Sequence, residues 1–112
     1  MVLKGYSVQE VNGVEYPMKW GLNQSMFYCE LRKCSIDQMN EELREISSDM
    51  TVLRDILWSA FKDGARVAKK EFDLTNYDIA DLMEEMSVEE MEKMVESMTE
   101  TLPRPRESKK KK

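Results

Sequence analysis

The sequence predicts a mainly α-helical α+β fold, in which an N-terminal β-hairpin packs on a bundle of about four to five helices and a disordered basic tail follows. Three observations predict this fold. A turn dipeptide and alternating apolar residues open the chain, helical periodicity replaces the alternation after Trp20, and residues 103–112 are prolines and polar or charged residues. We expect a single α-rich domain with its hairpin over residues 1–102 and a tail over residues 103–112.

The hairpin is predicted by Asn12-Gly13, because both central residues of a type I′ turn need positive φ. The residues that follow alternate apolar with polar, as in a strand with one buried face. The apolar positions of this second strand are Val14, Tyr16, Met18 and Trp20. The first strand fits less well, since Tyr6 and Val8 fall on the opposite face from Val11. A bulge, a longer loop or a strand with mixed faces would account for this.

Two helices are expected between the hairpin and residue 49. Asn23 can cap the first, which runs to about Cys34. Its apolar residues are Met26, Phe27, Cys29 and Leu31. Ser35 and Gln38 have the spacing of a capping box, which predicts a second, short helix. The short helix is expected to bury Met39, Leu43 and Ile46. Ser47-Ser48-Asp49 then ends it and caps the next helix.

The longest predicted helix covers about residues 50–70 and is expected to be the spine of the core. Its apolar residues recur at i+3 and i+4 in a broad stripe. They are Met50, Leu53, Ile56, Leu57, Ala60, Phe61, Gly64, Val67 and Ala68. Gly64 either ends the helix or permits close packing inside a longer one. The stripe continues in phase beyond Gly64, which favours one long helix.

Two further helices are predicted by their N-terminal caps. Thr75 begins a short helix with Asp78 in its first turn, and Ser87 with Glu90 has the form of a capping box. The short helix carries Ile79, Leu82 and Met83. The last helix presents one apolar face, made of Val88, Met91, Met94, Val95, Met98 and Leu102. Pro103 and Pro105 stop it.

The composition argues against an enzyme. The chain has no histidine, which removes the commonest general base and the commonest metal ligand. Its four glycines are scattered and form no phosphate-binding loop. Cys29 and Cys34 are the only cysteines, and we expect half-buried free thiols rather than a disulfide or a metal site. We therefore expect no catalytic residue, no cofactor and no metal.

Charge is distributed unevenly along the chain. Residues 1–70 contain ten basic and ten acidic side chains, whereas residues 71–100 contain eleven acidic side chains against Lys93 alone. An acidic helical face is usually a solvated face, and the alternative is a docking surface for a basic partner segment. No apolar run approaches the roughly 20 residues that span a membrane, and the N-terminus lacks the layout of a signal peptide, so we expect no membrane partner.

Methionine is the most unusual feature of the C-terminal part. The chain has ten methionines, and five of them fall between positions 83 and 98. Methionine adapts its shape and is over-used on surfaces that bind varied apolar partners. These residues are either the inner stripe of the last two helices or a partner surface, and both hold if the last helix docks loosely and can open. Such a helix also offers a route to a homo-oligomer. The candidate partner-binding residues are Met83, Met86, Met91, Met94, Val95 and Met98.

The four lysines at 109–112 are expected to form a solvated tail or to bind an anionic surface. A further interpretation concerns the messenger RNA, since consecutive lysine codons are A-rich. An A-rich heptamer near a stop codon is a common slippery site for ribosomal frameshifting.

Three stretches of the chain carry a resemblance to a known family. They are residues 11–23, a strand that runs into a helix; residues 50–62, in the long helix; and residues 74–83, before the closing acidic helix. In this order they resemble the tail assembly chaperones of long-tailed, siphovirus-type bacteriophages. The resemblance covers roughly residues 8–102 and consists of hydrophobic type and order, with no catalytic signature.

The resemblance implies a small protein of virion morphogenesis in the cytoplasm of the infected bacterial host, absent from the mature virion. Its expected partner is the long, aggregation-prone tape measure protein, which it keeps soluble until tail tube subunits polymerise and displace it; the tail tube protein is a second candidate partner. A programmed frameshift often makes an extended form in this family, which agrees with the lysine run. The family offers no residue-level binding motif, so the six candidate residues rest on periodicity alone.

Two other functions compete with this one. A structural phage component or a small helical adaptor, such as a head–tail connector subunit, would have a similar composition. A nucleic-acid-associated regulator would use the basic tail, but the acidity of the chain and the lack of a helix-turn-helix with basic recognition residues argue against it. We therefore expect no nucleic-acid partner.

Overall fold

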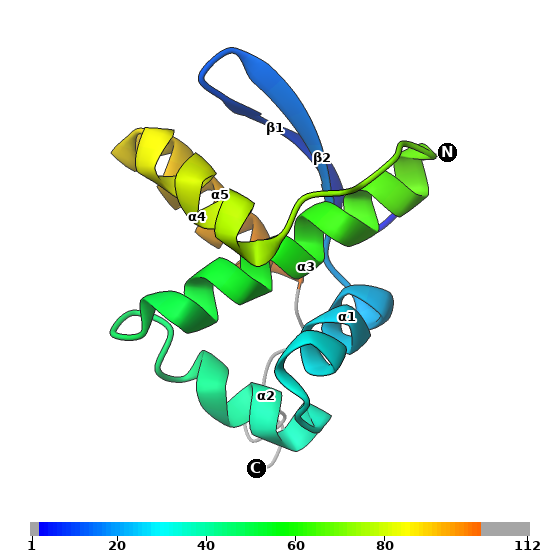
Figure 1. Cartoon of the computed structure of the whole chain (residues 1–112), viewed down its shortest axis with the longest axis vertical. Helices are drawn as coiled ribbons and strands as arrows, with labels where there is room; N and C mark the ends of the chain where they lie inside the picture. Colours follow the sequence, from blue (N-terminus) through cyan, green and yellow to red (C-terminus); the bar gives the residue numbers. More distant parts are fainter. Residues whose placement is uncertain (1–2, 102–112) are drawn as a thin grey trace, which may run out of the picture.

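The computed structural model describes residues 3–101, where a two-stranded antiparallel hairpin is followed by five helices (Figure 1). The strands are β1 (Tyr6–Val11) and β2 (Val14–Lys19). The helices are α1 (Leu22–Arg32), α2 (Ile36–Leu43), α3 (Met50–Ala68), α4 (Asn76–Glu85) and α5 (Val88–Thr101). The mainly α-helical α+β fold is confirmed. Leu102 and the tail expected at 103–112 lie outside the described residues.

The hairpin turns at Asn12 and Gly13, whose φ angles of 52° and 84° suit a type I′ turn. The strands pair residue for residue from this turn, without a bulge. The misfit of the first strand is therefore resolved as mixed faces. Val11 is buried against the core, whereas Val8 on the opposite face is 49% exposed.

α3 is the spine of the molecule, as expected. It contacts β2, α1 and α4, and in Figure 1 it crosses the centre, with α1 and α2 on one side and the hairpin and α5 on the other. Gly64 lies inside this helix. A Cβ at position 64 would overlap the carbonyl group of Pro17 and the Cα of Met18, so glycine lets β2 lie directly on α3. Of the two roles predicted for Gly64, close packing is confirmed.

The start of α1 differs from the sequence prediction. Its N-cap is Gly21 and not Asn23. The Gly21 N–H donates to Oε1 of Gln24 at 3.3 Å, so a side chain three residues later satisfies the half-buried amide at the helix start. Asn23 lies within the first turn and is exposed.

The buried face of α1 was also predicted wrongly. It consists of Gln24, Ser25 and Tyr28. The predicted apolar positions are exposed or half-buried, namely Met26, Phe27, Cys29 and Leu31. The polar face can be buried because its groups find partners on other helices. Gln24 Nε2 donates to Ser59 Oγ at 2.9 Å, and the Tyr28 hydroxyl donates to Glu42 Oε1 at 2.6 Å.

The remaining caps follow the sequence closely. The caps predicted for the last three helices all form, at Asp49, Thr75 and Ser87. Ser35 caps α2 by accepting the Gln38 N–H at 3.1 Å, but only this half of the predicted box forms, and the Gln38 side-chain Nε2 donates to Glu42 at 3.4 Å. Ile46 lies beyond the end of α2, in a turn, and still packs against the core.

Every strand and helix contributes to one hydrophobic cluster. Its buried members are Val11, Met18, Trp20, Tyr28, Met39, Ile56, Leu57, Ala60, Phe61, Ile79, Met94 and Met98. The last two come from α5, so the final helix closes the core against the hairpin.

Candidate functional site

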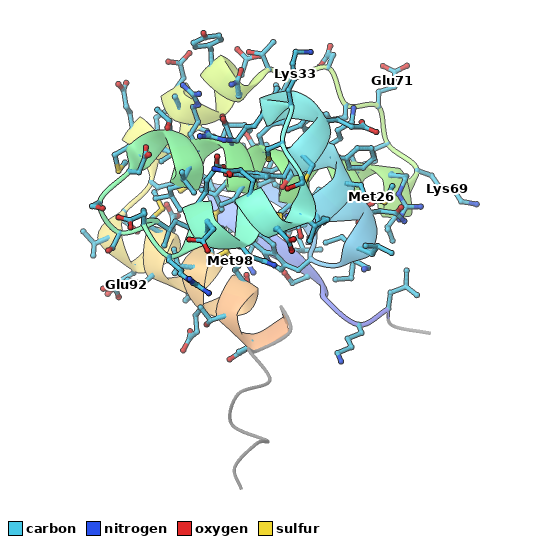
Figure 2. The ribbon with its side chains drawn as sticks, turned by 90° about the horizontal axis from the view of Figure 1, so that it is seen from below. Met26, Lys33, Lys69, Glu71, Glu92 and Met98 are labelled. Atoms are coloured by element: carbon cyan, nitrogen blue, oxygen red, sulfur yellow. The ribbon has the colours of Figure 1, made fainter. Side chains whose placement is uncertain are left out.

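The six candidate partner-binding residues belong to α4, to the junction after it and to α5. Met94 is completely buried and Met98 is 6% exposed. The other four are half-buried against the core, namely Met83, Met86, Met91 and Val95. In Figure 2, Met98 is directed into the body of the protein, whereas Glu92 on the same helix projects outward. The six residues therefore form the inner stripe of the last two helices, and partner binding by them stays a prediction.

α5 is attached to the hairpin by a few side chains. Met94 and Met98 enter the core, and the Trp20 indole Nε1–H donates to Ser97 Oγ at 3.0 Å. Ser97 Oγ in turn donates to the Met94 carbonyl oxygen at 2.7 Å. The strand that α5 contacts most is β1. The sequence had no local signal for the Trp20–Ser97 hydrogen bond, because the two residues lie 77 positions apart.

The tip of the hairpin also contacts the junction between α4 and α5. The Asn12 backbone N–H donates to Glu90 Oε2 at 3.4 Å, and Asn12 Nδ2 donates to Glu85 Oε1 at 3.3 Å. Both glutamates belong to the acidic stretch at residues 71–100. Because these hydrogen bonds are long and solvent-exposed, they orient the hairpin tip more than they stabilise it.

The apolar stripe of α5 is wider than the surface that covers it. Met94 and Met98 lie at the centre of the covered face, while Met91 and Val95 on its flank are half-buried and Val88 is 75% exposed. A shallow groove opens on this flank. It is lined by Met91, Glu92, Val95 and Glu96, and we call it the α5 groove.

The acidic residues around the α5 groove have no ion-pair partner in the described part of the chain. All ion pairs of residues 3–101 are formed by four arginines, Arg32, Arg44, Arg54 and Arg66, with acids between positions 41 and 63. Lys93 is exposed and is the one basic residue among positions 71–100. Within residues 3–101 the negative charge of this stretch is therefore not offset by ion pairs, and such a field attracts cations and basic side chains.

A contrasting cluster, which we call the polar network, joins α1 to α4. Arg32 lies at its centre and contacts Glu42 at 3.0 Å and Asp55 at 2.7 Å. Asp55 Oδ1 also accepts hydrogen bonds from Arg54 Nε at 2.8 Å and Asn76 Nδ2 at 3.1 Å. The Tyr28 hydroxyl, bonded to Glu42, completes the polar network. These are charge-assisted contacts, the strongest class of protein hydrogen bond.

The polar network shifts the ionisation of its members. Burial would raise the pKa of Asp55, but the hydrogen bonds from Arg54, Asn76 and Arg32 outweigh it and hold the pKa below its ordinary value. Burial, together with the hydrogen bond to Glu42, raises the pKa of the Tyr28 hydroxyl. Asp55 therefore stays ionised and Tyr28 protonated at neutral pH, which is the pairing that the hydrogen bonds require.

The two cysteines are half-buried free thiols, as expected. The Cys34 N–H donates to the Cys29 carbonyl oxygen at 3.0 Å, across the left-handed residue Lys33 that ends α1. Burial, followed by the neighbouring Cys34, raises the pKa of the Cys29 thiol to about 11. Cys29 is thus protonated at neutral pH and is a poor nucleophile.

An aromatic cluster around Lys62 was not predicted from the sequence. Its ammonium nitrogen lies 5.1 Å from the ring centre of Phe27, 5.4 Å from that of Trp58 and 5.8 Å from that of Phe72. The Trp58 indole also donates to the Leu74 carbonyl oxygen at 3.0 Å. The cluster fastens the connection between α3 and α4 to α1, because cation–π contacts act at this range.

None of the helices in the described part of the chain is both long and apolar enough to cross a membrane. Among residues 3–101, no three potential side-chain ligands gather as they would around a metal ion. Comparisons with protein-family models, with curated proteins and with solved structures found no match.

Proposed function

We propose that this protein is a tail assembly chaperone of a long-tailed bacteriophage. It binds the tape measure protein in the cytoplasm of the infected host and keeps it soluble until tail tube subunits polymerise around it. The chaperone then leaves and is absent from the mature virion. The proposal rests on the hydrophobic type and order of the sequence over roughly residues 8–102, which resembles that family, and on the surface of α5.

The observation that carries the proposal is the way α5 is attached. Methionine side chains supply most of its contacts with the core, and a part-buried hydrogen bond from Trp20 to Ser97 and an exposed one from Asn12 to Glu90 link it to the hairpin. Thioether contacts have little directional preference, so they can be exchanged for contacts with another apolar chain. A chaperone needs adaptable contacts of this kind because it must later release its client. Many copies along one long client add avidity to weak single contacts.

Co-expression tests the proposal directly. The tape measure gene of the same genome is expressed alone, with this protein, and with an unrelated acidic protein of similar size. We expect the tape measure protein to move into the soluble fraction and to co-purify only with this protein. A client that stays insoluble in all three cultures would contradict the proposal.

Purified virions separate a chaperone from a structural component. Mass spectrometry should detect the tape measure protein in the particles and should not detect this protein. Detection of this protein in a fixed ratio to tail proteins would instead support the structural or connector-like alternative.

A further inference from the structure

The α5 groove joins a strip of apolar surface to two acids that form no ion pair with the described residues 3–101. Met91 and Val95 lie four residues apart, so their side chains stack on neighbouring turns of α5 and form the floor. Both are half-buried, and Val88 extends the same strip to the start of the helix, where it is 75% exposed. The apolar floor is thus about two turns long and is open to solvent on one side.

The rim of the groove is acidic. Glu92 and Glu96 follow the two floor residues directly, are also four residues apart, and are both exposed. No basic side chain of residues 3–101 forms an ion pair with either of them. The apolar floor residues and the acidic rim residues therefore form two parallel rows along α5, each with a spacing of four residues.

We propose that the α5 groove is the docking site for a basic amphipathic helix of a partner protein. Such a helix repeats its side chains every three to four residues, so it can place apolar residues on Met91 and Val95 while lysines or arginines meet Glu92 and Glu96. A second copy of this chain is a poor occupant, because its own α5 would bring the same acidic rim against this one. Of the six predicted partner-binding residues, Met91 and Val95 line the α5 groove, whereas Met94 and Met98 are buried in the core.

The inference rests on the proposed function only for the identity of the partner, which would be a basic helical segment of the tape measure protein. The docking chemistry can be tested without any phage protein. The probe is a synthetic amphipathic helical peptide with leucines on one face and flanking lysines. A second peptide of the same design carries glutamates in place of the lysines.

Binding of the labelled peptides to the full-length protein is measured by fluorescence anisotropy. We expect the lysine peptide to bind and the glutamate peptide not to bind. The double variant Glu92→Lys/Glu96→Lys should weaken binding by about tenfold or more, because two attractive charge contacts become repulsive. Val95→Thr, which keeps the volume of the side chain but adds a hydroxyl to the floor, should also weaken it.

The matched control is Glu30→Lys/Glu45→Lys, which changes the net charge equally at two exposed positions on α1 and after α2. We expect this control to bind the lysine peptide like the wild type. Equal losses in both double variants would mean that net charge alone attracts the peptide, and would overturn the groove. Circular dichroism checks that all variants keep their helices.

Other occupants give different results. If the wild-type protein self-associates and Glu92→Lys/Glu96→Lys abolishes that association without a peptide effect, the groove holds a second copy and the proposal is overturned. If replacing the four lysines at 109–112 by glutamine tightens peptide binding tenfold or more, the groove belongs to the chain's own tail, which also overturns it.

The co-expression assay distinguishes this inference from the proposed function. A client kept soluble equally by the wild type and by Glu92→Lys/Glu96→Lys would overturn the tape measure protein as the partner of the α5 groove and would leave the chaperone proposal standing. If the lysine peptide binds in the α5 groove but the client stays insoluble on co-expression, the docking site is supported and the chaperone proposal is contradicted.

Discussion

The polar network and the attachment of α5 hold parts of the same core by different kinds of contact. In the polar network, Arg32 and Asp55 meet at 2.7 Å; Arg32 also contacts Glu42 on α2, and Asp55 also accepts a hydrogen bond from Asn76 on α4. α5 is held instead by the side chains of Met94 and Met98, by the part-buried Trp20–Ser97 hydrogen bond and by an exposed hydrogen bond from Asn12 to Glu90. Three of the five ion pairs among residues 3–101 belong to the polar network, and none of the five involves α5.

The difference determines which part of the molecule can move. Buried charged groups tolerate one arrangement, because separating them leaves a charge without a partner in a poor solvent. Methionine contacts lose some apolar burial when they open, but another apolar surface can restore it. We therefore expect α5 to open at a lower free energy than α1, α2 and α3, and the predictions below test this difference.

The largest effect is expected for Asp55→Ala. This change leaves Arg32 and Arg54 without their shared carboxylate, which is 4% exposed, and should destabilise the protein by roughly 3–5 kcal/mol. Urea unfolding measures the loss. The matched control is Glu41→Ala, because Glu41 pairs with Arg44 on the surface and should contribute less than about 1 kcal/mol. Similar midpoints for the two variants would show that the polar network does not hold the helices.

Acid should weaken the same network. The pKa of Asp55 is lower in the folded protein than its ordinary value near 3.9, so the stability from its ionised form is complete above about pH 4. It is lost as the pH falls through the folded value. Unfolding free energies of the wild type and Asp55→Asn should therefore converge below about pH 4. A difference that stays constant down to pH 2 would contradict this assignment.

Local sequence rules were sufficient for the hairpin, for α3 and for most helix starts. Asn12-Gly13 determines its turn by its own backbone preferences, and Thr75 or Ser87 caps a helix with groups three residues away. The buried face of α1 could not be derived in this way. Gln24 is buried because Ser59 lies opposite, 35 positions later, and without that partner Gln24 would belong on the surface.

The candidate surface was predicted only in part for a related reason. Helical spacing correctly placed the methionines on one stripe of α5. How much of that stripe is covered depends on where β1 docks against the helix, which no local pattern specifies. Met94 and Met98 are therefore covered, while Met91 and Val95 are left at the edge of the contact.

Met94→Ala tests whether α5 opens separately. Removing this buried side chain should destabilise the docking of α5 by roughly 2–5 kcal/mol, because a cavity replaces part of its contact with the core. Hydrogen exchange should become at least about 30-fold faster in α5, while α3 amides remain protected. Met26→Ala, at a 47% exposed position on α1, is the control and should change little. An equal loss of protection in α3 would show that α5 and α3 unfold together as one cooperative unit.

Ser97→Ala should have a smaller effect on the same attachment. It removes the acceptor for the Trp20 indole and should lower the stability of α5 docking by about 1 kcal/mol. Thr99→Ala is matched to it, because Thr99 bonds a carbonyl oxygen three residues earlier, as Ser97 does, but lies exposed. Hydrogen exchange of the α5 amides compares the two variants. If both change exchange equally, the indole contact contributes nothing to docking.

The smallest expected effect is that of salt on α5. Glu92, Glu96 and Glu100 repeat at i, i+4 along this helix, and each such pair of like charges costs about 0.2–0.5 kcal/mol. Raising NaCl from about 0.05 M to about 0.5 M shortens the screening length and should slow exchange in α5 by about twofold, with little change in α3. The same salt should weaken binding of the lysine peptide, because screening acts on the attraction and on the repulsion alike. Faster exchange in α5 at high salt would mean that its acids are already paired, which would remove the electrostatic basis of the α5 groove.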